Sequence, residues 1–190
     1  MNTILSIDTE RGLLTPGRFL PSPHCDDRPA NIPIDMLVVH GISLPPGEFG
    51  SSYIEQFFCG TLPISKHPYF STIASLKVSS HLFITRLGTL TQFVPFHKRA
   101  WHAGISRFKD KENCNDFSIG IELEGTDELP YEKVQYQILA EVILLLIRTY
   151  PNITEERIVG HNDIAPNRKT DPGPFFDWTY LKELLRTSHL

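Results

Sequence analysis

The sequence has no long apolar run and no excess of charge of either sign. Its longest apolar run, Val142–Ile147, falls far short of the ~20 residues that a membrane-spanning helix needs. The 18 basic and 22 acidic residues give a formal charge of −4, which is no electrostatic footprint for nucleic acid or for an anionic membrane. We therefore expect neither nucleic acid nor a membrane as a partner.

Cysteine is scarce, and its positions are scattered. Cys25, Cys59 and Cys114 form no close pair, which argues against a disulfide framework and a zinc knuckle. The N-terminal segment MNTILSIDTERG has neither the basic region nor the apolar region of a secretory signal peptide. Both observations favour a cytoplasmic location.

Proline and histidine are abundant instead. The chain of 190 residues has 15 prolines and eight histidines, and proline at about 8% exceeds the usual ~5%. The prolines concentrate in loop-like segments, which predicts a scaffold with long, shaped loops where binding sites tend to lie. The length predicts one domain with a core that needs no disulfides. We assign His189 to a C-terminal tail.

The apolar pattern predicts strands and helices around one central sheet. We expect residues 1–34 to form an irregular arm that packs on a catalytic domain spanning residues 35–187. The predicted strands cover residues 36–40, 81–85, 90–94, 117–124 and 157–161, the predicted helices cover 53–59, 131–150 and 178–187, and segments 62–70 and 101–115 are predicted loops. This order predicts a single α/β (α+β) domain with a mixed sheet flanked by helices.

One predicted strand, residues 117–124, carries large apolar side chains only at its odd positions. Ser118, Gly120, Glu122 and Glu124 share the other face. Because carboxylates are unfavourable within a strand, Glu122 is a candidate general base. The alternative is an exposed sheet face with two solvated glutamates.

Three side chains with metal-binding chemistry lie at or near strand ends. His40 and His161 each end a predicted strand, and Asp171 lies in a proline-rich loop. A catalytic zinc site takes three nitrogen or oxygen ligands and leaves one position for water. The same residues could instead be two hydrogen-bonded histidines and a turn-forming aspartate. Lys169 is then either an oxyanion stabiliser or an ordinary surface lysine.

Four longer segments narrow these alternatives. They read SLPPGEFG at 43–50, RAWHAG at 99–104, NDFSIGIELEGT at 115–126 and RKTDPGP at 168–174. In this order they resemble the AmpD family, the cytoplasmic 1,6-anhydro-N-acetylmuramyl-L-alanine amidases of Gram-negative bacteria. The resemblance extends from about residue 21 to about residue 185. It implies the fold that these enzymes share with phage-lysozyme-type amidases and peptidoglycan recognition proteins.

The resemblance also implies roles for the candidate residues. His40, His161 and Asp171 match the ligands of one zinc ion. Glu122 matches the proposed general base of the family, and Lys169 matches its proposed oxyanion stabiliser.

A second group of residues matches the substrate groove of the family. Trp101 and the loop that contains Ala165, Pro166 and Arg168 fall where the family lines this groove, and Trp101 beside His102 offers an aromatic platform for a sugar ring. Two positions depart from the family. Gly41 stands where members carry Asn, and Lys77 stands where they often carry Arg.

The function implied by the resemblance is zinc-dependent hydrolysis of the amide between 1,6-anhydro-N-acetylmuramic acid and L-alanine. This reaction belongs to cell-wall recycling, and through it to the regulation of β-lactamase. We expect a monomer whose partner is a small anhydromuropeptide. Two alternatives are a non-catalytic muropeptide-binding module and a broader amidase that acts on intact murein.

Overall fold

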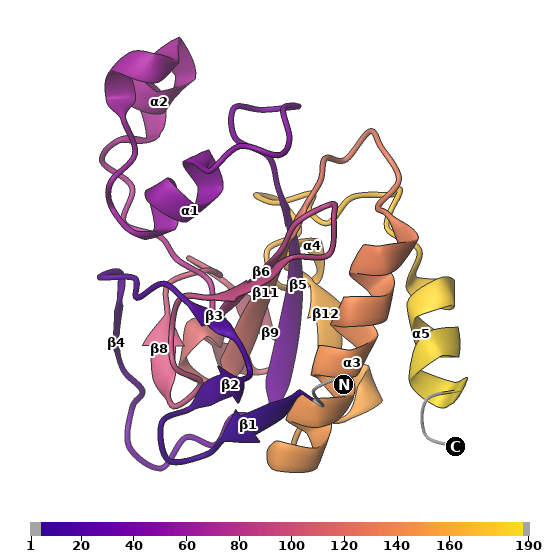
Figure 1. Ribbon diagram of the computed structural model, residues 1–190. Helices are drawn as coiled ribbons and strands as arrows, with labels where there is room; N and C mark the ends of the chain where they lie inside the picture. The colour runs from indigo at the N-terminus through magenta and orange to yellow at the C-terminus, as the bar shows by residue number, and fades with distance from the viewer. Residues whose placement is uncertain (1–4, 188–190) are drawn as a thin grey trace.

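The computed structural model describes residues 5–187 and centres on a six-stranded mixed sheet (Figure 1). The strand order is β12-β5-β11-β6-β7-β3. The strands are β3 (Arg18–Phe19), β5 (Met36–Ile42), β6 (Leu82–Ile84), β7 (Leu90–Gln92), β11 (Ser118–Glu124) and β12 (Ile158–Gly160). Strands β12, β5, β11 and β6 run parallel to one another, and β7 returns antiparallel to β6. The predicted mixed sheet and the predicted hairpin near residues 81–94 are confirmed.

The N-terminal segment differs from the irregular arm that the sequence predicts. It contains β1 (Ser6–Asp8), β2 (Leu13–Thr15), β3 and β4 (Cys25–Asp27). Strand β3 joins the edge of the main sheet beside β7, and β4 pairs with β8 (Lys98–Ala100). Strands this short have no detectable alternation of side chains, and their partners lie far away in the sequence. Residues 1–4 and His189 lie outside the described residues.

The helices comprise two long ones and several short ones. They are α1 (Tyr53–Phe58), α2 (Pro68–Ile73), α3 (Lys133–Thr149), α4 (His161–Ile164) and α5 (Trp178–Thr187), with 3₁₀ turns η1 (Ile64–Lys66), η2 (Cys114–Asp116) and η3 (Glu155–Arg157). The predicted loops at 62–70 and 101–115 therefore contain η1, part of α2, η2 and the hairpin β9 (Arg107–Phe108) to β10 (Lys111–Glu112). Helices α3 and α5 lie side by side along one face of the sheet (Figure 1).

Both long helices begin where the sequence provides capping groups. At the start of α3, the backbone N–H of Glu132 donates to Gln135 Oε1 at 3.0 Å, and the backbone N–H of Gln135 donates to the carbonyl oxygen of Glu132 at 2.9 Å. These bonds satisfy backbone N–H groups that have no partner within the helix. At α5, Asp177 Oδ1 accepts a hydrogen bond of 2.9 Å from the backbone N–H of Tyr180. The cap predicted at Asp177 is confirmed.

The alternation along β5 and β11 separates the core from the functional face. Leu37 and Val39 of β5 and Ile119 and Ile121 of β11 are fully buried in the largest apolar cluster, which α3 completes. The opposite face is partly apolar as well, because Met36 and Val38 of β5 are buried in a second apolar cluster. A period of two thus places His40 and Glu122 on the face away from the largest cluster, toward the ends of their strands.

Within residues 5–187, no helix combines the length and the apolar character that crossing a membrane requires.

Candidate metal centre and active site

The site forms where parallel strands end, on the face of the sheet opposite the largest apolar cluster. His40 of β5 and Glu122 of β11 are direct neighbours in the parallel register, so their side chains point to the same face. His161 follows β12, the other neighbour of β5. The sequence places His161 at a strand end, whereas in the structure it is the first residue of α4. This short helix turns the chain back toward Asp171.

The three predicted ligand residues converge. His40 Nδ1 lies 3.0 Å from His161 Nδ1 and 3.2 Å from Asp171 Oδ2. His161 Nδ1 lies 3.1 Å from the same carboxylate oxygen. Tetrahedral zinc with bonds of ~2.0 Å separates its ligand atoms by about 3.3 Å. The three atoms therefore have the spacing of one face of a zinc coordination shell.

The hydrogen bond on the far side of His161 shows which of its nitrogens is available to a metal ion. Its Nε2 lies 3.1 Å from the carbonyl oxygen of Ala103, which can only accept, so Nε2 carries a proton and Nδ1 is the nitrogen that can present a lone pair. Burial lowers the pKa of His40 to about 4, so the His40 ring is neutral at pH 7. Lone pairs from two imidazoles and a carboxylate repel one another unless a cation or a proton lies between them. The donor set thus fits a metal ion.

Glu122 is buried beside this cluster and is free to exchange a proton. Its Oε1 lies 3.9 Å from His40 Nδ1, and among the described residues its buried Oε2 has no hydrogen-bond partner. Burial raises the pKa of Glu122 well above its ordinary value, the Asp171 carboxylate adds to the rise, and the Lys169 ammonium opposes it. A carboxyl group with a raised pKa next to a metal site is typical of a general base.

Glu124, two residues along the same face, has a different role. Its Oε1 accepts from the backbone N–H of Gly50 at 2.6 Å, and its Oε2 accepts from that of Arg86 at 3.0 Å. Both glutamates are buried, so the alternative of two solvated glutamates is wrong. Glu124 joins two loops to the sheet, whereas Glu122 lies beside the three candidate ligand residues.

A cavity of about 240 Å³ opens onto the cluster. Lys169 and Gly41 line it together with the three ligand residues and Glu122. The aliphatic and phenyl side chains of its wall come from Ile42, Leu44, Phe57, Phe58, Ile73, Leu76 and Val78. At Gly41, the hydroxyl of Tyr131 fills the space in which a Cβ atom would stand.

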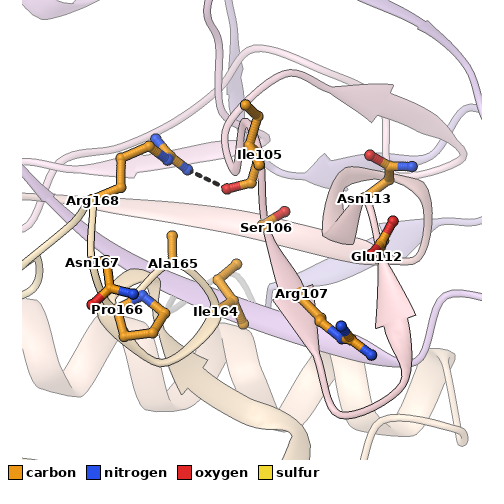
Figure 2. A pocket seen from close by; sticks show the side chains of 10 residues that line it. All are labelled: Ile105, Ser106, Arg107, Glu112, Asn113, Ile164, Ala165, Pro166, Asn167 and Arg168. Carbon is orange, nitrogen blue, oxygen red and sulfur yellow. Dashed lines mark hydrogen bonds between the residues drawn. The ribbon is translucent and has the colours of Figure 1, made fainter.

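A second cavity, of about 390 Å³, includes three of the predicted groove residues (Figure 2). Ala165, Pro166 and Arg168 line it. Arg168 Nη2 donates to the carbonyl oxygens of Ala103 at 2.6 Å and Ile105 at 2.8 Å, so its guanidinium connects the two loops that form the walls.

The other two predicted groove residues line neither of these cavities. Trp101 stacks on His24, with ring centroids 6.3 Å apart, and its Nε1–H donates to Asp26 Oδ1 at 3.1 Å. Lys77 is exposed between Leu76 and Val78 of the first cavity wall.

Sequence reasoning named His102 only as the neighbour of Trp101 and missed its contact with His40. Its Nδ1 lies 2.9 Å from His40 Nε2, on the side of that ring which points away from the cluster. Burial lowers the pKa of His102 well below its ordinary value, so the ring is neutral. No spacing motif marks this residue, and only its place beside Trp101 in a resembling segment could have drawn attention to it.

Comparison with known proteins agrees with this geometry. Residues 30–174 match the N-acetylmuramoyl-L-alanine amidase family. The 1,6-anhydro-N-acetylmuramyl-L-alanine amidase AmpD of Escherichia coli is 55% identical over 176 residues, which cover 93% of this chain and 96% of that protein. The chain belongs to the N-acetylmuramoyl-L-alanine amidase family.

Solved structures place this amidase in the same family and fold. A crystal structure of an AmpD selenomethionine derivative is 54% identical, with a TM-score of 0.90 over 94% of this chain and 98% of that one. The amidase AmiD from E. coli, solved with anhydro-N-acetylmuramic acid-L-Ala-D-γ-Glu-L-Lys, is 32% identical, with a TM-score of 0.59 over 82% of this chain and 59% of that one.

A more distant likeness concerns the fold alone. The Drosophila peptidoglycan recognition protein SD is 14% identical, with a TM-score of 0.57 over 86% of this amidase and 88% of that chain. The predicted membership of the amidase and recognition-protein fold is confirmed.

Proposed function

We propose that this amidase hydrolyses the bond between the lactyl carbonyl of 1,6-anhydro-N-acetylmuramic acid and the L-alanine nitrogen of a small muropeptide, with one zinc ion held by His40, His161 and Asp171. The observation that carries the proposal is the convergence of two imidazole lone pairs and a carboxylate oxygen within 3.0–3.2 Å of one another, beside the buried Glu122. Two imidazoles and one carboxylate form a donor set of the kind found in catalytic zinc sites.

A zinc ion bound there supplies Lewis-acid chemistry and an acidified water. Glu122 accepts the proton of the attacking water, because its carboxylate adjoins the ligand atoms and its Oε2 is otherwise unpaired. It then returns that proton to the departing alanine nitrogen. The ammonium of Lys169, which lines the same cavity, stabilises the negative charge that develops on the carbonyl oxygen.

The relatives support the substrate class. AmpD of E. coli is named for the 1,6-anhydro sugar, and AmiD was solved with an anhydromuropeptide. In this chain, apolar side chains of phenylalanine, leucine, isoleucine and valine line the same cavity as the three ligand residues. Such a wall suits the apolar face of a rigid bicyclic sugar. A rigid ligand loses less freedom on binding. We infer that the protein works as a monomer in cell-wall recycling in the cytoplasm, and thereby in β-lactamase regulation.

The experiment that tests this function compares matched muropeptides with 1,6-anhydro and reducing sugar ends. Contacts to the anhydro bridge worth ~1–3 kcal/mol predict a preference of about 10–200-fold per contact for the anhydro form. Release of the intact peptide, identified by its mass, confirms which bond is cut. Equal rates on both forms, or efficient release of peptides from intact sacculi, would indicate a broader amidase. Binding without turnover in zinc-loaded protein would indicate a recognition module.

A further inference from the structure

A chain of buried polar groups leads away from His40 on the side opposite the ligand cluster. His40 Nε2 lies 2.9 Å from His102 Nδ1, and His102 Nε2 lies 3.1 Å from Ser118 Oγ. Ser118 Oγ in turn lies 2.5 Å from the carbonyl oxygen of Cys114. All four residues are buried, so these polar groups form hydrogen bonds with one another and not with water.

The direction of every proton in this chain follows from its last member. The Cys114 carbonyl can only accept, so the hydroxyl proton of Ser118 points to it, and the Ser118 oxygen must accept from His102 Nε2–H. A neutral His102 then has a bare Nδ1, which accepts from His40 Nε2–H. His40 therefore presents a bare Nδ1 to Asp171 and His161.

The opposite arrangement would prevent metal binding. If His102 carried its proton on Nδ1, that proton would point at His40 Nε2 and leave the proton of His40 on Nδ1. A protonated nitrogen cannot ligate a metal, so the ring would first have to change its tautomer. Partners that fix the orientation and tautomer of a ligating histidine commonly account for 10–100-fold in metal affinity or activity.

We propose that His102 is a positioning residue that sets the tautomer of His40 for metal binding, directed by Ser118 and the Cys114 carbonyl. This inference rests on the zinc site of the proposed function and extends it to residues that do not touch the metal.

The local sequence is arranged to hold His102 in this orientation. Asn115 Oδ1 accepts from the backbone N–H of His102 at 3.1 Å and from that of Ala103 at 2.8 Å. Gly120 provides the room, since a Cβ atom at this position would lie 2.4 Å from the His102 ring. The small side chains at positions 118 and 120 of β11 are thus explained by the space and the hydrogen bond that His102 needs, and not only by access for a substrate.

The first test needs no variant. In metal-free wild-type protein labelled with ¹⁵N, two-bond proton–nitrogen correlations report which nitrogen of each histidine carries the proton. We expect His40 and His102 both as the Nε2–H tautomer. A His40 ring with its proton on Nδ1, or with a mixture of the two tautomers, would overturn the proposal.

The second test measures zinc affinity by competition with a chromophoric chelator. We expect about 10–100-fold weaker zinc binding in His102→Leu, and recovery of most of that loss in His102→Asn, whose side-chain oxygen can accept from His40 Nε2–H. The matched control is His81→Leu, because His81 is equally buried but bonds to the backbone of Gly120 and Lys98 and to Arg28. Its zinc affinity should stay at the wild-type value.

A third variant covers the possibility that His102→Leu does not fold. Ser118→Ala removes only the oxygen that orients His102, and we expect it to weaken zinc binding and to give a tautomer mixture at His40. Wild-type zinc affinity in folded His102→Leu or in Ser118→Ala would overturn the proposal. A wild-type protein that binds no zinc would contradict the proposed function instead, and the tautomer measurement would still decide the role of His102.

Discussion

At the scale of single residues, the site separates two glutamates that the sequence presents as equivalent. Glu122 and Glu124 lie on the same buried face of β11. Backbone N–H groups occupy both oxygens of Glu124, whereas Glu122 keeps one oxygen unpaired. A general base needs a free lone pair at the reacting atom, so the hydrogen bonds favour Glu122 for this role.

Glu122→Gln should remove catalysis and leave the metal in place. Glutamine has nearly the same shape but cannot accept the proton, and a positioned base is worth ~10²–10⁴ in rate. We expect turnover to fall by that factor, with zinc content by elemental analysis and substrate affinity by calorimetry unchanged. Turnover within a few-fold of wild type would assign the proton transfer to another group.

Lys169→Ala should act on turnover more than on the Michaelis constant. A charge that stabilises the developing oxyanion interacts with the transition state, and losing one such donor costs about 10²–10³ in kcat. Steady-state kinetics on a purified muropeptide measure both constants. The matched control is Lys182→Ala, which removes an exposed lysine of α5. A raised Michaelis constant with normal turnover would make Lys169 a substrate-binding residue.

Single site residues could be predicted from the sequence only where the pattern that marks them lies in one segment of the chain. His40 and Glu122 could be nominated because each belongs to a strand whose apolar pattern is clear. The role of His102 could not be predicted, because its partners His40 and Ser118 come from other segments and meet it only after the sheet forms. Its function depends on hydrogen-bond directions, which no sequence pattern records.

At the scale of elements, the ends of the strands position the loops that border the cavity. Glu124, the last residue of β11, binds the backbone of Gly50 in one loop and of Arg86 in the next. The Arg86 guanidinium lies 4.8 Å above the Phe49 ring and pairs with Glu132 at the start of α3. One buried carboxylate thus connects the sheet to two loops, and Arg86 extends that connection to a helix.

Glu124→Gln should loosen these loops without removing the metal. The amide group turns one acceptor into a donor and leaves the backbone N–H of Gly50 or of Arg86 without its partner, and the loss of such a hydrogen bond costs about 1 kcal/mol. Urea denaturation should show that loss, with zinc affinity unchanged. Glu128→Gln, at an exposed position in the following loop, is the matched control and should leave stability within about 0.5 kcal/mol of wild type. Equal stability of both variants would contradict the role given to Glu124.

Elements were predictable from the sequence where a pattern was long enough to repeat. Helix α3 has 17 residues and strand β11 has seven, so their periods of 3.6 and 2 are visible. Strands β3 and β4 have two and three residues, and helix α4 has four, which is too few to show a period. These short elements owe their structure to tertiary partners, and α4 is the one that carries His161.

At the scale of the whole molecule, the cluster of His40, His161 and Asp171 joins parts of the chain that are far apart in the sequence. His40 lies in β5, while His161 and Asp171 come from α4 and the loop after it, between β12 and α5 (Figure 1). The sheet places β12 directly beside β5, but the segment from His161 to Asp171 lies beyond the strand and contains several exposed residues. A metal ion that binds all three residues therefore connects this segment to the sheet.

Zinc removal should accordingly lower stability as well as activity. A ligand that binds only the folded state stabilises it by about 2.7 kcal/mol when its free concentration is 100 times its dissociation constant. For a chain of this size, that free energy corresponds to a shift of about 5–10 °C in the thermal midpoint. We expect chelated protein to show this decrease together with loss of turnover, and zinc to restore both.

The variant His161→Ala separates the effect of losing the metal on stability and turnover from any direct effect of the chelator. Without one of its three ligands, the variant should bind zinc too weakly to show the zinc-dependent rise in thermal midpoint, and it should be inactive. Asn162→Ala changes the next residue, which is not one of the three converging ligands, and should keep the zinc-dependent rise. Full zinc content in His161→Ala would remove His161 from the ligand set. If the thermal midpoint of the wild-type protein does not change with zinc while turnover depends on zinc, the stabilising role of the metal is wrong. The segment from His161 to Asp171 would then be fixed by its protein contacts alone, such as the hydrogen bond of 3.0 Å from the Asn162 N–H to the Asp171 carbonyl oxygen.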